Sequence, residues 1–361
     1  MADTTRRPRR FAVLTEGYLD DPSSGKTAHG VMRFRPEEIA AAIDSKYAGK
    51  RVSDVVPSLP CDAPVVANLQ QALAHRPTSL LIGVATHGGT LPPHLRACVL
   101  GAIDAGLEIV NGLHQFLNDD PQFVEHAKRS GARLWDVRAV GKVPLFTGAA
   151  YDVPARIVLA VGSDCAVGKM TATLEIERAA QRSGARAEFV ATGQTGIIIA
   201  GWGTCVDRVI SDFVTGAAEQ LVLNASPRSD VLLVEGQGSI FHPAYAPVTF
   251  GLLYGSAPDA LILCHRPNAT TIDGFNNAIP PLRELVEAHE KLLEHVKPAR
   301  VVAIVLDTSA LDAASAQRAI DAASAETGLP ADDPVRNGGE RLWNAIERAL
   351  AGIAKPASVS P

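Results

Sequence analysis

A loop bounded by two glycines, at the junction of a strand and a helix, constrains the fold of this chain more than any other segment. Residues 155–171 read A-R-I-V-L-A-V-G-S-D-C-A-V-G-K-M-T. The apolar, β-branched run at Ile157–Val161 predicts a buried strand, and the Ala-, Glu- and Arg-rich run that ends at Gly184 predicts a helix. A strand, a glycine loop and a helix in this order predict a phosphate-binding loop in a parallel α/β sheet.

The loop has the residue types that bind an anion. Gly162 and Gly168 permit backbone angles and a close approach that a side chain would prevent, so several N–H groups can converge on one anion. Lys169 adds a positive charge to the same oxygen atoms. The residues expected to contact the phosphates of a ligand are Gly162, Ser163, Asp164, Cys165, Ala166, Val167, Gly168, Lys169, Met170 and Thr171. The alternative is a glycine-rich turn that only packs, and the lysine at its end argues against it.

The loop departs from the usual Mg-nucleotide pattern. Five residues separate the glycines, where the standard loop has about four. Met170 follows the lysine, and Thr171 comes one position later. Because a helix turns about 100° per residue, Thr171 points away from the position of the usual magnesium ligand. The loop therefore favours a bound phosphate over a hydrolysed Mg-nucleotide.

Predicted strands and helices alternate along the whole chain. Before the loop, a surface loop is predicted at Asp20–Gly30, strands at Phe11–Leu14, Ser79–Val84, Leu107–Val110 and Arg133–Val137, and helices at Pro36–Ile43, Pro64–Ala74, Pro93–Ala105 and Pro121–Arg129. After it, strands are predicted at Arg186–Ala191, Val231–Val234, Asp259–Cys264 and Arg300–Leu306, and helices at Asp212–Leu223, Pro280–Val296, Asp307–Ser324 and Gly339–Ile353. This alternation predicts βαβ units in two α/β domains, joined by a linker at Gly141–Pro154.

Composition excludes several classes of protein. The 361 residues suit two domains, and 47% hydrophobic with 20% charged residues is typical of a compact soluble protein. A net charge of −5 provides no overall basic field for nucleic acid. Four arginines near the start could form a basic arm, although a solvated, disordered tip is the favoured interpretation. They are Arg6, Arg7, Arg9 and Arg10.

Cysteine usage and hydropathy predict a cytoplasmic protein. The five cysteines are widely spaced and form no C-x-x-C pair, which indicates reduced thiols without a zinc ribbon or a disulfide framework. They are Cys61, Cys98, Cys165, Cys205 and Cys264. No apolar run approaches the roughly 18 to 20 residues that cross a bilayer, and the N-terminus lacks a hydrophobic signal region.

A second informative segment reads V-L-L-V-E-G-Q-G-S at residues 231–239. Four residues of buried type run directly into Glu235, as expected of a central strand that delivers an acid beside the glycine loop. Such an acid can accept a proton, orient a water or hold a metal. Gln237 and His242 follow on the same loop. The alternatives are a Glu235 that only accepts backbone hydrogen bonds and a His242 that is an ordinary core or surface residue.

Further polar residues follow other predicted strands. Gln194 lies in the polar end, Thr192–Gly196, of the strand at Arg186–Ala191, and Arg266 follows the strand at Asp259–Cys264, where it would suit a phosphate or a carboxylate. In the first half of the chain, two strand ends carry residues that could line a cleft or could simply be polar turn residues. They are His87, Gly88, Gly89, Asn111 and His114.

These motifs together resemble known proteins. The stretched loop G-S-D-C-A-V-G-K and the strand ending V-E-G-Q-G are similar to the dethiobiotin-synthetase branch of P-loop proteins. The segments G-S-D-C-A-V-G-K-M-T, A-T-G-Q-T-G-I, V-E-G-Q-G-S-I-F-H-P and G-S-A-P-D-A more closely resemble a bacterial family whose members have an N-terminal Rossmann-like domain and a C-terminal P-loop NTPase-like parallel-sheet domain. The resemblance covers nearly the whole chain and implies domains at 1–145 and 146–361.

The resemblance also implies an activity. Some members of this family, of the DgcN type, act as D-glutamate (D-amino-acid) N-acetyltransferases that use acetyl-CoA. The glycine loop and Gln194 would then bind acetyl-CoA without a metal, and the base that deprotonates the amine would be Glu235 or His242. Gln194, Gln237 and backbone N–H groups would stabilise the oxyanion. A loop that holds coenzyme phosphates without cleaving them needs no magnesium ligand, which fits Met170.

Two other functions stay open at this point. The first is an ATP-dependent ligase or kinase similar to dethiobiotin synthetase, in which Asp164, Thr171 and Glu235 would share magnesium. The second is a non-catalytic nucleotide sensor. The expected partner is a small amino acid, with no nucleic acid and no membrane. Association into a homo-oligomer is expected only by analogy with other two-domain enzymes.

Overall fold

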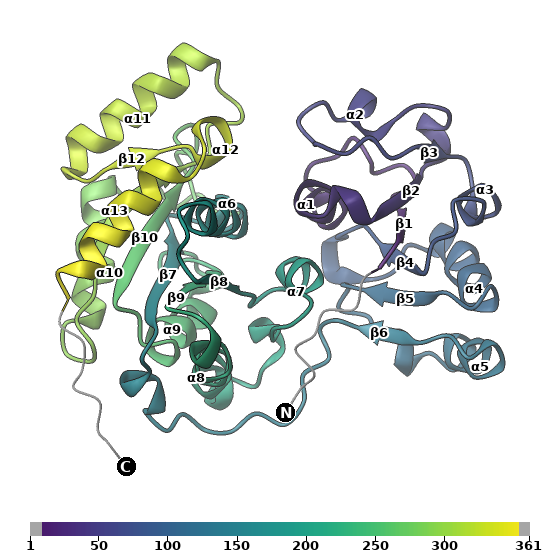
Figure 1. Ribbon diagram of the computed structural model, residues 1–361, viewed down its shortest axis with the longest axis horizontal. Coiled ribbons are helices and arrows are strands. Elements are labelled where there is room, and N and C mark those ends of the chain that lie inside the picture. Colours follow the sequence, from purple (N-terminus) through teal and green to yellow (C-terminus); the bar gives the residue numbers. More distant parts are fainter. Residues whose placement is uncertain (1–8, 354–361) are drawn as a thin grey trace. The chain divides into compact units, whose positions relative to one another are not determined.

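The computed structural model describes residues 9–353, which form two units (Figure 1). The first unit contains the residues up to Ala139 together with Gln194–Cys205. The second contains Val140–Gly193 and the residues from Val206 on. Each unit has one six-stranded sheet in which all strands are parallel, which confirms the predicted α/β class. The predicted division at residue 145 stays a prediction.

The first unit is a doubly wound sheet with strand order β3-β2-β1-β4-β5-β6. The order reverses between β1 and β4, as in Rossmann-like domains. Its strands are β1 (Phe11–Leu14), β2 (Ile39–Ile43), β3 (Val65–Val66), β4 (Ser79–Ile82), β5 (Glu108–Asn111) and β6 (Leu134–Asp136). Its helices are α1 (Lys26–Phe34), α2 (Val52–Val55), α3 (Leu69–Leu73), α4 (Arg96–Asp104), α5 (Pro121–Ser130) and α7 (Gln194–Ala200).

The second unit has strand order β12-β11-β10-β7-β9-β8. Its strands are β7 (Arg156–Gly162), β8 (Ala187–Val190), β9 (Val231–Val234), β10 (Ala260–His265), β11 (Arg300–Leu306) and β12 (Ala331–Asp332). Its helices are α6 (Lys169–Arg182), α8 (Val214–Ala225), α9 (Ala246–Gly255), α10 (Leu282–Leu293), α11 (Ala313–Thr327), α12 (Pro334–Asn337) and α13 (Glu340–Ala351). Because β7 lies between β9 and β10, the loops after those two strands flank the glycine loop.

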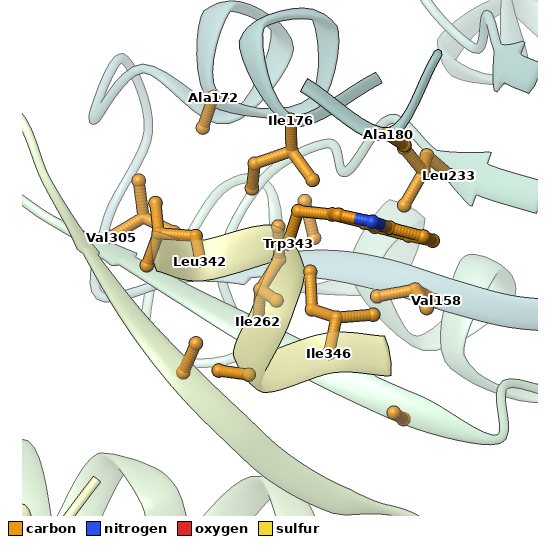
Figure 2. Packing of buried hydrophobic residues seen from close by; sticks show 14 of the residues in the cluster. Val158, Ala172, Ile176, Ala180, Leu233, Ile262, Val305, Leu342, Trp343 and Ile346 are labelled. Atoms are coloured by element: carbon orange, nitrogen blue, oxygen red, sulfur yellow. The ribbon is translucent and has the colours of Figure 1, made fainter. Parts of the chain in front are cut away.

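A core cluster around Trp343 holds α6 and α13 on one face of the second sheet (Figure 2). Trp343 is 2% exposed and packs among Ile176 and Ala180 of α6 and Val158 of β7. Its indole Nε1 is buried and finds no hydrogen-bond partner among the described residues. Since α6 begins at Lys169, this packing also fixes the helix that carries the loop lysine.

The structure corrects four predicted segments. The loop predicted at Asp20–Gly30 contains the start of α1, whose buried face is formed partly by small residues that hide its helical pattern. The helix predicted at Pro36–Ile43 is one 3₁₀ turn followed by β2, whose alanines have low strand propensity but are fully enclosed in the sheet. At Pro64–Ala74, β3 precedes a shorter helix, α3, which Asn68 caps. The polar segment Thr192–Gly196 contains the start of α7.

The other predicted strands and helices overlap observed ones, and the Arg300–Leu306 strand coincides with β11. The interpretation of the N-terminal arginines as a solvated, disordered tip is wrong for Arg9, which is buried, whereas Arg10 is exposed but held by a hydrogen bond. Arg9 is 8% exposed and pairs with Glu108 at 2.7 Å, and Arg10 donates to the carbonyl of His75. Arg6 and Arg7 lie outside the described residues.

Two predicted absences can be compared with the described residues of both units. None of the five cysteines, all of which lie within the described residues, forms a disulfide. Within residues 9–353, none of the helices has both the length and the apolar character needed to cross a bilayer.

Candidate functional site

The glycine loop connects β7 to α6 and folds around its own lysine. Lys169 Nζ donates to the carbonyl oxygen of Asp164 at 2.7 Å, and a Cβ on Gly162 would lie 2.9 Å from this ammonium group. Ala166 and Gly168 adopt left-handed φ angles of 52° and 85°. Burial lowers the pKa of Lys169, although neighbouring acidic groups, Cys165 first among them, oppose that shift. An incoming anion would therefore replace a neutral carbonyl with a charged partner for a poorly solvated cation.

Asp164 and Ser163 connect the glycine loop by hydrogen bonds to the segments that follow β10 and β9. The Asp164 carboxylate accepts the N–H of Cys165 at 2.6 Å and, through its other oxygen, the N–H of Asp273 at 2.7 Å. Ser163 Oγ lies 2.9 Å from His265 Nδ1, and Ser239 Oγ donates to the Ser163 carbonyl at 3.2 Å. Asp273 follows β10 and Ser239 follows β9, so both neighbouring loops hold the glycine loop in place.

Arg266 also braces the loop. Its guanidinium donates to Asp307 at 2.8 Å and to the carbonyl of Ala166 at 2.7 Å. These bonds direct the guanidinium to the loop backbone, which leaves the predicted role as a phosphate or carboxylate partner a prediction. Hydrogen bonds from Ser309 and Arg266 outweigh burial and lower the pKa of Asp307.

Glu235 immediately follows β9 and is 4% exposed. Its Oε2 accepts the N–H groups of Thr192 at 2.8 Å and Gly193 at 3.0 Å. Burial raises the pKa of Glu235 to about 7, because desolvation outweighs these two hydrogen bonds. Gln237 completes this side of the site by donating to Thr192 Oγ1 at 3.1 Å, and a Cβ on Gly193 would lie 2.6 Å from its amide nitrogen.

His242 lies against the glycine loop and is 2% exposed. One ligand-type atom from each of Asp164, Cys165 and His242 lies within 4.8 Å of the other two. His242 Nδ1 accepts the N–H of Ala244 at 3.2 Å, so in the neutral ring Nε2 carries the proton. In this tautomer Nε2–H can donate a hydrogen bond, and the role of His242 as the base stays a prediction.

The same three residues present oxygen, sulfur and nitrogen atoms of the kind that bind zinc. Both Asp164 oxygens and His242 Nδ1 already accept backbone N–H groups. Three of the oxygen and nitrogen lone pairs in this group are therefore already used by backbone donors.

The remaining residues that were predicted to bind the cofactor do not all belong to the same unit. Met170 and Thr171 lie half-buried in the first turn of α6. Gln194 begins α7 and is grouped with the first unit, where a Cβ on Gly112 would lie 3.2 Å from its side chain. Its assignment to the cofactor therefore stays a prediction.

In the first unit, the candidate cleft residues form closed turns. Asn111 is fully buried and donates to Asp136 Oδ1 at 2.7 Å and to the carbonyl of Gln115 at 2.8 Å. A Cβ on Gly89 would lie 2.5 Å from the His114 ring. These contacts favour polar turn residues, and Gly88 lies exposed in the same turn. The structure describes His87 only by its backbone.

The structure adds residues to the site that the sequence analysis missed. Asp273 contributes a backbone N–H, which no side-chain pattern could indicate. Tyr245 and Phe275 contact the His242 ring, with ring centroids 4.6 Å and 5.3 Å away. The only signal for Tyr245 was its place in the same loop as His242.

Comparisons with known proteins agree with the folds of the two units. Two family descriptions match the chain: "Domain of unknown function (DUF1611_C) P-loop domain" over residues 144–343, and "Domain of unknown function (DUF1611_N) Rossmann-like domain" over residues 45–140. A D-glutamate N-acetyltransferase of Tritonibacter scottomollicae is 34% identical over 92% of this chain and 97% of its own length. One of a Pseudoalteromonas species is 36% identical over 72% of this chain and 78% of its own length.

A solved structure supports the same assignment. The crystal structure of a DUF1611 family protein from Anabaena variabilis has a TM-score of 0.89 and 36% sequence identity, and covers 94% of this chain and 99% of its own. The Rossmann-like sheet, the P-loop sheet and these relatives together show that the chain belongs to the DUF1611 family.

Proposed function

We propose that this protein is an N-acetyltransferase that moves an acetyl group from acetyl-CoA to the amine of a small acidic D-amino acid, with D-glutamate as the first candidate. The observation that carries the proposal is the similarity to two relatives named D-glutamate N-acetyltransferase, one of which aligns along nearly its whole length. A loop suited to anions supports a donor that carries phosphates.

The glycine loop is the proposed phosphate site of the donor. Lys169 would exchange the Asp164 carbonyl for phosphate oxygens, and the N-terminus of α6 would add its positive dipole end. The phosphates are held and not cleaved, so a magnesium ligand directly after the lysine is unnecessary. Met170 is compatible with this use of the loop.

Glu235 is the proposed base. The attacking amine must be neutral, and a carboxyl with a pKa of about 7 is half ionised near neutral pH. In the proposed step the amine nitrogen bonds to the thioester carbonyl carbon, and Glu235 accepts the amine proton. The carbon–sulfur bond then breaks, and the proton passes from Glu235 to the leaving sulfur, which releases the thiol of CoA. The Gln237 amide is the proposed donor to the developing oxyanion.

The position of Glu235 makes this step testable. Glu235 is held on the β8 side of the glycine loop by Thr192 and Gly193. A base gives a lower kcat when changed to glutamine, whereas a residue that only supports the phosphate loop gives a higher KM for acetyl-CoA.

The first experiment follows thiol release from acetyl-CoA with D-glutamate, L-glutamate and other D-amino acids as acceptors. A parallel thermal-shift titration uses acetyl-CoA, CoA, ATP and ATP with magnesium, since a ligand of the native state raises the melting temperature. Turnover with D-glutamate and a shift with the CoA compounds are expected. A shift with Mg-ATP alone, or no turnover with any acidic D-amino acid, contradicts the proposal.

A further inference from the structure

An aromatic cluster, composed of His242, Tyr245 and Phe275, spans the glycine loop. His242 and Tyr245 follow β9, and Phe275 follows β10. Because β7 lies between these two strands, the contact of Phe275 with His242, at 5.3 Å between ring centroids, crosses the loop that follows β7. The bonds of Ser239 and Asp273 to the loop show that both flanking segments reach it.

The two outer rings of this cluster are exposed although they border a buried histidine. Tyr245 is 56% exposed and Phe275 is 40% exposed, whereas His242 is 2% exposed. Among the large apolar side chains that the described residues leave exposed, these two are the aromatic ones. Exposed aromatic faces beside an anion-binding loop are the arrangement that stacks a nucleobase.

We infer that Tyr245 and Phe275 form the stacking platform for the adenine ring of acetyl-CoA. The inference rests on the proposed function and deepens it, because it assigns the nucleotide end of the donor to the aromatic cluster. In CoA the adenosine is joined directly to the phosphates, while the thioester lies at the far end of the pantetheine arm. Phosphates held at Lys169 therefore place the adenine close to the loop, and these rings are the apolar surface that the loop borders.

The test compares two donors on the whole protein: acetyl-CoA, and acetyl-pantetheine, which lacks the nucleotide. Tyr245→Ala and Phe275→Ala are each expected to raise KM for acetyl-CoA about tenfold, the scale of one base–aromatic stack, with kcat unchanged. With acetyl-pantetheine, both variants should match the wild type. Tyr245→Phe and Phe275→Tyr keep a ring and should keep the wild-type KM. Ile210→Ala, which removes a side chain that is 74% exposed, is the matched control.

Three results would overturn the platform. They are an unchanged KM for acetyl-CoA in both alanine variants, an equal loss with both donors, and a loss in the ring-preserving variants as large as in the alanine variants. If the wild type transfers acetyl from neither donor, it is the proposed function that fails. Calorimetric titration with CoA and with pantetheine then applies the same comparison to binding alone.

Discussion

The carboxyl edges of the two sheets use polar residues in opposite ways. In the first unit, buried carboxylates join the segments at the ends of different strands: Asp44 accepts the N–H groups of Gly17 and Leu19, and Asp136 accepts from Asn111 and Asn118. In the second unit, the corresponding edge gathers a buried lysine and a buried glutamate with shifted pKa values.

The difference shows that a shared architecture does not imply a shared use. Both edges bury charged groups, and burial raises the pKa of Asp44 in the first unit as well. The carboxylates Asp44 and Asp136 of the first unit are enclosed by hydrogen bonds that hold neighbouring loops together. Those of the second unit are desolvated beside exposed aromatic rings and a glycine loop, which is the environment of a binding or catalytic centre. Four substitutions test this contrast, from the largest expected effect to the smallest.

Trp343→Ala should have the largest effect, because it removes the side chain at the centre of the cluster in Figure 2. We expect a loss of about 3–5 kcal/mol in the free energy of unfolding, measured by urea denaturation. Activity should also fall, since α6 loses its packing against α13. Trp343→Phe keeps most of the volume and removes the unpartnered N–H, so it should cost far less. Equal losses in the two variants would contradict the packing argument.

Lys169→Met should lower kcat/KM for acetyl-CoA by about a hundredfold or more, because it removes the charge that the loop is proposed to offer the phosphates. Steady-state kinetics and a binding titration with CoA measure the loss. Lys291→Met, at an exposed lysine that pairs with Glu294, is the control and should behave as wild type. Undiminished CoA affinity in Lys169→Met would show that the loop assignment is wrong.

Asp136→Ala tests the carboxyl edge of the first unit's sheet. Its carboxylate accepts four hydrogen bonds, two from the Asn111 and Asn118 side chains and two from the N–H groups of Leu117 and Asn118. Buried donors left without an acceptor should lower the free energy of unfolding by about 1–3 kcal/mol. kcat and KM below the melting temperature should not change. A large kinetic effect without destabilisation would assign this edge a role in function and break the contrast.

Glu235→Gln tests the carboxyl edge of the second unit's sheet through the pH dependence of the free energy of unfolding. The pKa of Glu235 rises from 4.5 to about 7 on folding, so between these values the folded protein holds a proton that the unfolded chain has released. The free energy of unfolding should therefore fall as pH rises through this window, by roughly 1–3 kcal/mol from this group. Urea denaturation between pH 4 and 8 should show that the variant lacks this slope.

The activity of the wild type should rise with pH through about 7, as the Glu235 carboxylate ionises. A wild-type profile that is flat across this range, with Glu235→Gln fully active, would exclude Glu235 as the base.

Patterns with local causes were predictable from the sequence. The glycine loop, the strand before Glu235 and the helix after Lys169 each combine a periodic apolar run with a turn signal, and the structure has all three. The Ala-rich β2 and the Ile-rich α7 were not predictable, because their intrinsic propensities oppose the structure that tertiary packing imposes.

The contacts that define the site lie beyond such patterns. Asp164 is held by a backbone N–H more than a hundred residues away, and any residue type at position 273 except proline could provide it. Phe275 reaches His242 only because the strand order places β7 between β9 and β10. A sequence read alone indicates which residues follow strands, but not which strands are neighbours.

The helix α7 gives the first unit an unusual order of synthesis. α7 packs beside α1. The Thr195 hydroxyl oxygen lies 3.4 Å from that of Thr27, and Arg35 donates to the Ile199 carbonyl. A nascent chain that has reached Ala139 therefore still lacks a helix of its first unit, and that helix leaves the ribosome only after β7 and β8. The N-terminal half cannot finish folding before the phosphate loop has been made, and a gene divided at the linker would encode an incomplete first unit.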